Sequence, residues 1–234
     1  GDPDSGIFKG PYVRLRLPFR PADPGWRDTL AWYEGPDPYG HQAAAFARLA
    51  SERTGQPCRP QPTLVTTGTG SGKTEAFLYP ILNHVLGARR AGVRGLKALI
   101  LYPMNALAND QAVRLTKLLT THAALAGVTA ALYTGQDGPV RTTVSAAGLI
   151  TDRGAIRDTA PDILLTNYKM LDQLLLRAED QQLWRRSATS LRYLVLDEFH
   201  TYDGAQGTDV AMLLRRLGLA LKSQWSDDDP LVDE

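Results

Sequence analysis

Short apolar runs alternate with longer helix-forming segments along most of the chain, starting near residue 41. The apolar runs have the length of β-strands, and strands are expected at residues 63–67, 97–102, 128–133, 162–166 and 191–197. The segments between them predict helices at residues 41–54, 72–86, 106–126 and 168–177, with one more at residues 206–221. Strands that alternate with helices are typical of βαβ units with a parallel sheet. The chain is therefore expected to adopt an α/β fold in which helices sandwich a parallel sheet.

The amino-terminal part differs from the rest in composition. Prolines recur through the first 40 residues and prevent long helices. Within it, residues 13–17 read Val-Arg-Leu-Arg-Leu, and this period of two predicts one strand. A solvated edge face is favoured over a phosphate-binding stripe for its two arginines. We therefore expect an extended arm over residues 1–37, one main domain over residues 38–222, and an acidic tail or linker over residues 223–234.

The charge balance limits how the chain can bind a polyanion. It carries 26 Lys and Arg against 25 Asp and Glu, a formal net charge of +1, within 234 residues that can bury a full core. Such a charge gives no overall attraction to phosphate backbones. Any contact with nucleic acid must therefore be local.

The single cysteine and the short apolar runs exclude further classes. One cysteine, Cys58, excludes an internal disulfide and argues against a zinc or iron–sulfur site held by cysteines. No apolar run reaches the length of a membrane span, and no signal-peptide pattern is present. These features predict a cytoplasmic protein without a membrane partner. The chain lacks an initiator Met and stops soon after the acidic residues 227–229, so we expect it to be part of a larger protein.

A glycine-rich loop follows the first expected strand of the main domain and precedes an expected helix, in the order of a P-loop. Its glycines allow backbone N–H groups to face phosphates, Lys73 reaches the terminal phosphates, and the Thr74 hydroxyl binds Mg²⁺. The alternative is a strand-to-helix turn that binds nothing. Thr67 stands where the general pattern has glycine. The expected nucleotide-binding residues are Thr67, Gly68, Thr69, Gly70, Ser71, Gly72, Lys73 and Thr74.

An acidic motif, Asp197-Glu198-Phe199-His200, lies at the end of the last expected strand. One carboxylate can hold Mg²⁺ through its waters while the next orients and deprotonates the attacking water. We assign Asp197 to the metal and Glu198 to the water, and expect His200 to sense the γ-phosphate. An Asp-Glu pair alone is equally compatible with a solvated strand end, so the assignment depends on its occurrence together with the P-loop.

These motifs resemble those of superfamily-2 helicases, because residues 197–200 match the DExH box, residues 102–111 match motif Ia and residues 165–171 match motif Ib. Residues 200–204 and 207–217 are similar to the MrfA/YprA-type branch, and helicases of anti-phage systems such as DrmA of DISARM share these features. The resemblance covers most of residues 38–221. It implies a RecA-like lobe that uses ATP and Mg²⁺, and a role in DNA repair or anti-phage defence.

The resemblance also implies roles for residues whose function the local sequence pattern does not indicate. Gln42, in a stretch similar to the Q-motif, would hydrogen-bond adenine. Short polar groups at loop ends would contact one nucleic-acid strand, DNA being favoured over RNA. Helix capping and turn formation are the alternative for these groups. The expected strand-contacting residues are Pro103, Met104, Asn105, Thr134, Gly135, Thr166 and Asn167.

A complete motor of this kind has two RecA-like lobes, and this chain matches only the first. The second lobe supplies arginine fingers, so we expect the isolated chain to hydrolyse ATP slowly. The main hypothesis is an ATP-driven helicase or translocase. One alternative is a nucleotide-gated scaffold that recruits partner proteins of a defence complex. Another is a P-loop ATPase unrelated to nucleic acid, such as a transporter ATPase, which motifs Ia and Ib disfavour.

Overall fold

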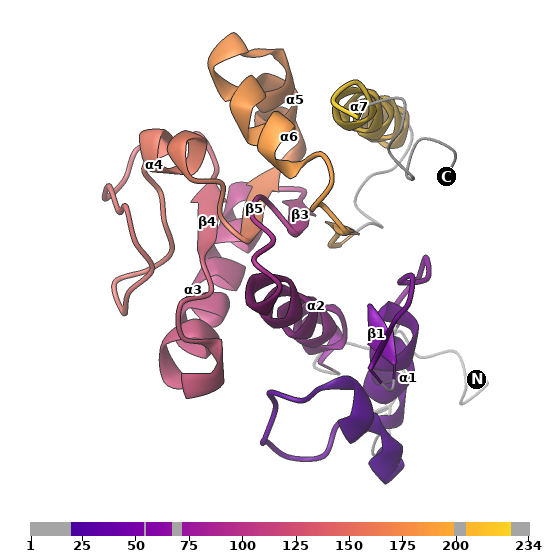
Figure 1. The fold of residues 1–234 in the computed structure, drawn as a ribbon. Helices are drawn as coiled ribbons and strands as arrows, with labels where there is room; N and C mark the ends of the chain where they lie inside the picture. The colour runs from indigo at the N-terminus through magenta and orange to yellow at the C-terminus, as the bar shows by residue number, and fades with distance from the viewer. Residues whose placement is uncertain (1–19, 54, 67–71, 199–204, 226–234) are drawn as a thin grey trace, which may run out of the picture.

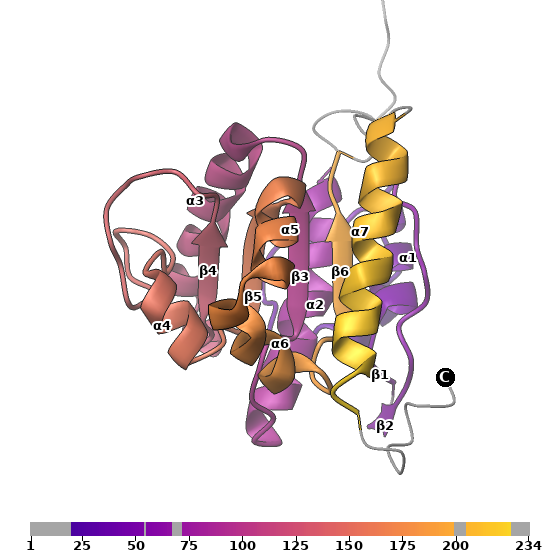
Figure 2. The same ribbon diagram turned by 90° about the horizontal axis from the view of Figure 1, so that it is seen from above.

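A parallel four-stranded sheet forms the centre of the computed structural model, which describes residues 20–53, 55–66, 72–198 and 205–225 (Figure 1). Its strands are β3 (Ala98–Tyr102), β4 (Ala130–Tyr133), β5 (Ile163–Asn167) and β6 (Tyr193–Leu196), in the order β4-β5-β3-β6. Every neighbouring pair is parallel. All four strand arrows therefore point the same way in Figure 2. The expected α/β fold with a parallel sheet is confirmed.

Helices cover both faces of the sheet. Successive residues along a strand point to opposite faces, and residues on both faces are therefore buried. Ala98 and Ile100 of β3 face α2 (Lys73–Arg90) and α3 (Asn105–Thr121), in one hydrophobic cluster. Leu99 and Leu101 face the opposite side, in a second cluster. That side is covered by α4 (Arg153–Asp158), α5 (Tyr168–Leu176), α6 (Gln181–Ser187) and α7 (Ala205–Lys222). The sheet is thus sandwiched by helices, as Figure 1 shows.

The helices α5 and α7 agree with the sequence within one residue at each end. By contrast, α1 (Gly40–Leu49) and α3 end five residues before the expected residues 54 and 126, and α2 ends four residues after the expected residue 86. Short elements that the sequence pattern did not predict are α4, α6 and three 3-10 helices: η1 (Pro24–Thr29), η2 (Ala123–Leu125) and η3 (Ala178–Asp180). The buried indole of Trp184 anchors α6, because its Nε1 donates to the carbonyl of Leu174 at 2.9 Å. Long-range packing therefore stabilises elements too short to show a clear periodicity.

Part of the amino-terminal arm packs onto the main domain. In η1 and just after it, Trp26, Leu30 and Trp32 are almost fully buried. Trp32 Nε1 donates to the carbonyl of Tyr79 on α2 at 3.3 Å, and the two rings meet edge to face. Residues 1–19, which include the strand expected at residues 13–17, lie outside the described residues.

The strand expected at residues 63–67 is a wrong prediction for residues 63–66, which form no strand, while residue 67 lies outside the described part. Pro60 and Pro62 lack N–H donors, which disfavours a ladder at the start of this segment. Instead, Arg48 on α1 binds the carbonyl of Pro62 at 2.8 Å, and Leu64 remains 78% exposed. Just before it, β1 (Glu52–Arg53) and β2 (Gln56–Pro57) form a small antiparallel pair.

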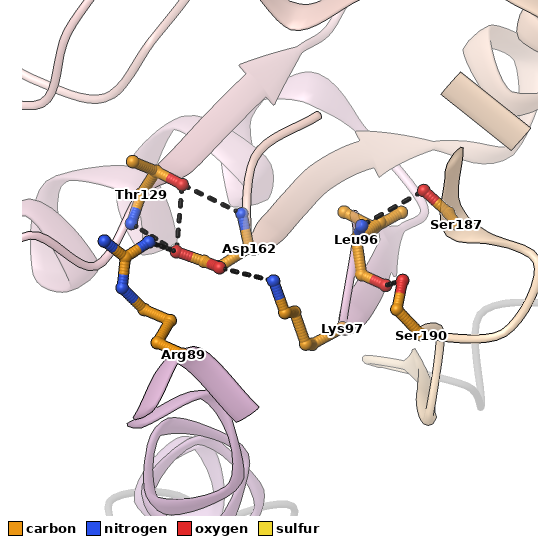
Figure 3. A network of polar contacts seen from close by, with 7 residues as sticks. All are labelled: Arg89, Leu96, Lys97, Thr129, Asp162, Ser187 and Ser190. Carbon is orange, nitrogen blue, oxygen red and sulfur yellow. Dashed lines mark hydrogen bonds and ion pairs between the residues drawn. The ribbon is translucent and has the colours of Figure 1, made fainter. Parts of the chain in front are cut away.

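A buried ion cluster ties the amino ends of three strands to the end of α2 (Figure 3). Asp162, directly before β5, accepts from Lys97 Nζ and Arg89 Nη1 at 2.8 Å each. Its Oδ2 also accepts from the backbone N–H of Thr129 at 2.8 Å and from its hydroxyl at 2.9 Å. Lys97 precedes β3, Thr129 precedes β4, and Arg89 lies in the last turn of α2. This cluster lies at the sheet edge opposite to the strand carboxyl ends.

Candidate functional site

The described end of the P-loop begins α2. Gly72 caps this helix with φ of 75°, a left-handed conformation that favours glycine, and Lys73 and Thr74 form the first helical residues. A Cβ atom on Gly72 would lie 2.2 Å from Nε2 of Gln42, so a side chain there would displace the end of the Gln42 side chain. The expected nucleotide-binding residues Thr67, Gly68, Thr69, Gly70 and Ser71 lie outside the described residues.

Gln42 lies against this end of the loop. Its Nε2 donates to the carbonyl of Gly72 at 3.1 Å, and its Oε1 accepts from the backbone N–H of Tyr39 at 2.8 Å. The side chain is 8% exposed. Gln42 thus caps α1 and contacts the P-loop at once. The expected contact with adenine stays a prediction.

The acidic motif follows β6 at the same edge of the sheet. The backbone N–H of Asp197 donates to the carbonyl of Leu101, which fixes the end of β6 against β3. Glu198 has φ of 51°, the one described non-glycine residue with positive φ, and its N–H donates to Asp197 Oδ1 at 2.9 Å. Such strained residues occur at functional sites. Phe199 and His200 lie outside the described residues.

Burial raises the pKa of the Asp197 carboxyl, and the charge of Glu198 adds to this effect. The hydrogen bond from the Glu198 N–H and the positive charges of Lys73 and Arg114 oppose it. Among the described residues, no lysine or arginine forms an ion pair with Asp197. Within the described ranges, this carboxylate therefore lies partly buried without an ion-pair partner.

A cavity of about 980 Å³ brings the two motifs together. Lys73 from α2 and Asp197 and Glu198 from the end of β6 all line it. Its other walls are the open edge of β6 and the segment 59–66. A basic side chain and two carboxylates that converge on one cavity at the strand carboxyl ends match the place where α/β sheets bind ligands.

The donors at and beside this cavity fit Mg²⁺: Asp197 lines it, and Thr74 directly follows the lining residue Lys73. Hydroxyl and carboxylate oxygens are ligands that Mg²⁺ accepts, and it commonly uses one or two carboxylates together with substrate phosphates. Thr74 and Asp197 would hold it. The partly buried Asp197 carboxylate, which has no described ion-pair partner, can provide the charge that a divalent cation needs.

The residues expected to contact a nucleic-acid strand gather at the carboxyl ends of β4, β5 and β3, which are neighbours in the sheet (Figure 2). Asn167 Nδ2 donates to Asn105 Oδ1 at 2.6 Å, and this bond joins the ends of β5 and β3. Met104 is 55% exposed beside them, and Pro103 is half-buried. Asn167 also caps α5 by accepting from the N–H of Met170. Asn105 and Asn167, with Pro103 and Met104 beside them, therefore lie together along this edge of the sheet, and we call this group the ridge.

Thr166 and Gly135 position the chain next to this ridge. The Thr166 side chain is fully buried and donates to the carbonyl of Tyr133 at 2.5 Å, so it positions β4 and does not reach solvent. Thr134 is half-buried, and Gly135 has φ of 74° with Met170 directly behind it. A side chain at Gly135 would lie 2.5 Å from the Met170 sulfur. The glycine therefore permits the close approach of this turn to α5.

Two charged residues at the site were not singled out in the sequence. Arg114 on α3 donates from Nη1 to Thr74 Oγ1 at 3.4 Å, and its Nη2 forms an ion pair with Glu75. Glu75 directly follows the P-loop Lys-Thr pair, which could have drawn attention to it. Arg114 has no comparable signal, because its partners lie about 40 positions earlier.

Comparison with known proteins identifies the family of this chain. A family model described as DEAD/DEAH box helicase matches residues 39–226. The Druantia protein DruE of Escherichia coli (strain UMEA 4076-1) is 27% identical over 276 residues, which cover 77% of this chain and 15% of that protein. The uncharacterized ATP-dependent helicase YprA of Bacillus subtilis (strain 168) is 29% identical over 190 residues, which cover 81% of this chain and 21% of YprA.

Solved structures give the same result. The DUF1998 helicase MrfA bound to DNA and AMPPNP aligns with a TM-score of 0.60 and 27% identity, over 89% of this chain and 26% of that chain. The helicase Lhr of Mycobacterium smegmatis bound to ssDNA and AMP-PNP aligns with a TM-score of 0.56 and 26% identity, over 78% of this chain and 21% of that chain. The resemblance to superfamily-2 helicases and the RecA-like fold are confirmed.

The chain is short relative to these proteins, spanning 15% of DruE and 21% of YprA. No helix in the described part is long and apolar enough to cross a membrane. The matched residues 39–226 contain the P-loop, motifs Ia and Ib and the acidic motif. The chain belongs to the DEAD/DEAH box helicase family.

Proposed function

We propose that this chain is the ATP-binding lobe of a nucleic-acid-dependent ATPase, a helicase or translocase that acts on DNA. The observation that carries the proposal is the cavity shared by Lys73, Asp197 and Glu198 at the strand carboxyl ends. The ridge at Asn105 and Asn167 follows the same sheet edge. Family membership and the DNA-bound MrfA and Lhr structures support it.

The roles of the cavity residues follow from their charges and positions. Lys73, at the amino end of α2, binds the terminal phosphates of ATP, where the helix dipole also favours negative charge. Thr74 and Asp197 hold Mg²⁺, which when bound neutralises charge on the phosphates. Glu198, whose positive φ sets it apart from the strand, orients and deprotonates the attacking water.

The nucleic-acid strand binds to the ridge, with the Thr134–Gly135 turn beside it. The ridge consists of Pro103, Met104, Asn105 and Asn167. The amide side chains of Asn105 and Asn167 and the backbone N–H groups of the non-proline residues suit phosphates, and such contacts position a nucleic-acid strand without reading its sequence. A net charge of +1 gives little long-range attraction, so affinity depends on these local contacts.

The proposal extends to the wider protein. A second RecA-like lobe would close on the cavity and supply the charge stabilisation that speeds phosphoryl transfer. Similarity to the MrfA/YprA-type branch and to DruE favours a role in DNA repair or anti-phage defence, in the second case with partner proteins. The competing function is a nucleotide-gated scaffold that recruits such partners to DNA without coupling hydrolysis to movement.

The test is steady-state ATP hydrolysis by the full-length protein, alone and with single-stranded DNA, duplex DNA or RNA. We expect strong stimulation by DNA, loss of the activity in Lys73→Ala, and no change in Lys117→Ala, which alters an exposed lysine on α3. Calorimetry should show that Lys73→Ala binds ATP much more weakly. Unchanged ATP hydrolysis with every polymer, while ATP still binds, would favour the scaffold.

A further inference from the structure

The helix α3 spans both halves of the proposed site. It begins at Asn105, whose side chain accepts from Asn167 on the ridge. Nine residues later Arg114 reaches the first turn of α2. At 1.5 Å per residue the two points lie about 14 Å apart along the helix axis. A rigid helix of this kind moves both ends together.

Arg114 contacts two consecutive residues of α2. Its guanidinium donates to Thr74 Oγ1 at 3.4 Å and forms an ion pair with Glu75 Oε1. Arg114 is 49% exposed and Glu75 is 24% exposed, so the ion pair lies at the rim of the site. The fork of the guanidinium can serve both acceptors at once, which the point charge of a lysine cannot do.

Glu75 in turn faces the P-loop. Its Oε2 lies 3.2 Å from the position that a Cβ on Gly72 would take. The described part of the chain gives this buried oxygen no hydrogen-bond partner, and Arg114 forms the ion pair with the other oxygen, Oε1. Arg114 therefore contacts Thr74, one of the two expected Mg²⁺ ligands, without lining the cavity.

We propose that Arg114 is a positioning residue that couples strand binding to nucleotide binding: it ties α3, which carries the ridge residue Asn105, to Thr74 and Glu75 beside the P-loop. This inference rests on the proposed function. Movement of α3 on strand binding is passed through the guanidinium to the Thr74 hydroxyl. Because a cation bound at Thr74 repels the guanidinium, Glu75 is the acceptor that keeps Arg114 attached to α2.

The test measures how nucleotide changes strand affinity in the full-length protein. The dissociation constant of a fluorescent single-stranded DNA is determined with and without AMPPNP and Mg²⁺, and the ratio of the two gives the coupling. In Arg114→Gln we expect the ratio to move toward one by about 3- to 30-fold, the range for residues along a coupling network. Affinity for DNA without nucleotide should stay the same, because Arg114 lies about 14 Å along α3 from the ridge residue Asn105.

Further substitutions test whether the loss of coupling is specific to the contact between Arg114 and Glu75. Glu75→Gln should reduce the ratio as Arg114→Gln does, and the double variant should reduce it no further. Arg114→Lys should restore part of the coupling. Lys117→Gln removes the same charge from the next turn of α3 and should leave the ratio unchanged. If Arg114→Gln is unstable, Glu75→Gln carries the same test.

The outcomes separate this inference from the function on which it rests. If the DNA affinity of the wild-type protein does not depend on nucleotide, the proposed motor function is overturned, and so is the coupling role of Arg114. A coupled wild type whose ratio is unchanged in Arg114→Gln and in Glu75→Gln would overturn the role of Arg114 alone. An equal loss in Lys117→Gln would also overturn it, because the effect would then be one of charge only.

Discussion

Replacing Asp162 by asparagine should destabilise the protein more than any surface change of the same kind. The carboxylate is 3% exposed and accepts from Lys97, itself 3% exposed, from Arg89, and twice from Thr129 (Figure 3). An asparagine keeps the shape but loses the charge. Its amide group also turns a donor toward the Lys97 ammonium or the Arg89 guanidinium, where an acceptor is required.

The magnitude follows from the burial of Lys97. Removing one partner of a buried ion pair leaves an uncompensated charge and costs about 3–5 kcal/mol. Arg89 is 40% exposed and can turn to water, so Lys97 accounts for most of this cost. A domain of this size has a total stability of about 5–15 kcal/mol. The variant should therefore lose a large share of its unfolding free energy.

Urea unfolding followed by circular dichroism measures this loss. The control is Asp37→Asn, which breaks an equally short ion pair with Arg27 that is 56% and 60% exposed and should cost less than about 1 kcal/mol. Adding Lys97→Met to Asp162→Asn should recover most of the loss, because the buried charge then disappears. A loss of less than about 1 kcal/mol in Asp162→Asn would refute the reasoning, since unpaired buried charges cost more than this.

Two other predictions concern α2. Gly72→Ala should lower the unfolding free energy by roughly 1–2 kcal/mol because its backbone is left-handed, and should weaken ATP binding by displacing Gln42. Gly87→Ala, in open space on the same helix, should instead raise the unfolding free energy by roughly 0.5–1 kcal/mol. Equal effects of the two substitutions in urea unfolding would contradict this. Burial lowers the pKa of His84 from 6.5 to about 4, so unfolding free energy should fall by about 3 kcal/mol as pH drops between these values; His84→Gln should remove this slope.

The sequence predicted the sheet where apolar runs are unambiguous. Residues 97–102 and 162–166 became β3 and β5 within one residue at each end, because a strand buried on both faces must be apolar throughout. Lys97 and Asp162 are exceptions at the starts of these runs. Charged residues at strand ends are usually solvated, and no local pattern indicates that these two form a buried ion pair.

The remaining features depend on contacts between distant segments. The segment 63–66 resembles a strand in isolation, but it forms no strand, and Arg48 binds the Thr63 hydroxyl and the carbonyl of Pro62 instead. The site residues Lys73, Asp197 and Glu198 were predicted because their motifs are local, and the structure places them on one cavity. Arg114 and the burial of Thr166 were not predicted, since each is set by a partner more than 30 positions away.

Single-turnover ATP hydrolysis by Glu198→Gln in the full-length protein, with single-stranded DNA present, tests most directly whether this cavity is the catalytic site. The substitution keeps the shape of Glu198 and removes the base, so the ATP dissociation constant should hardly change while the hydrolysis rate falls by about 100-fold or more. Wild-type hydrolysis in this variant would contradict the assignment of the attacking water to Glu198, and with it the proposed catalytic role of the cavity.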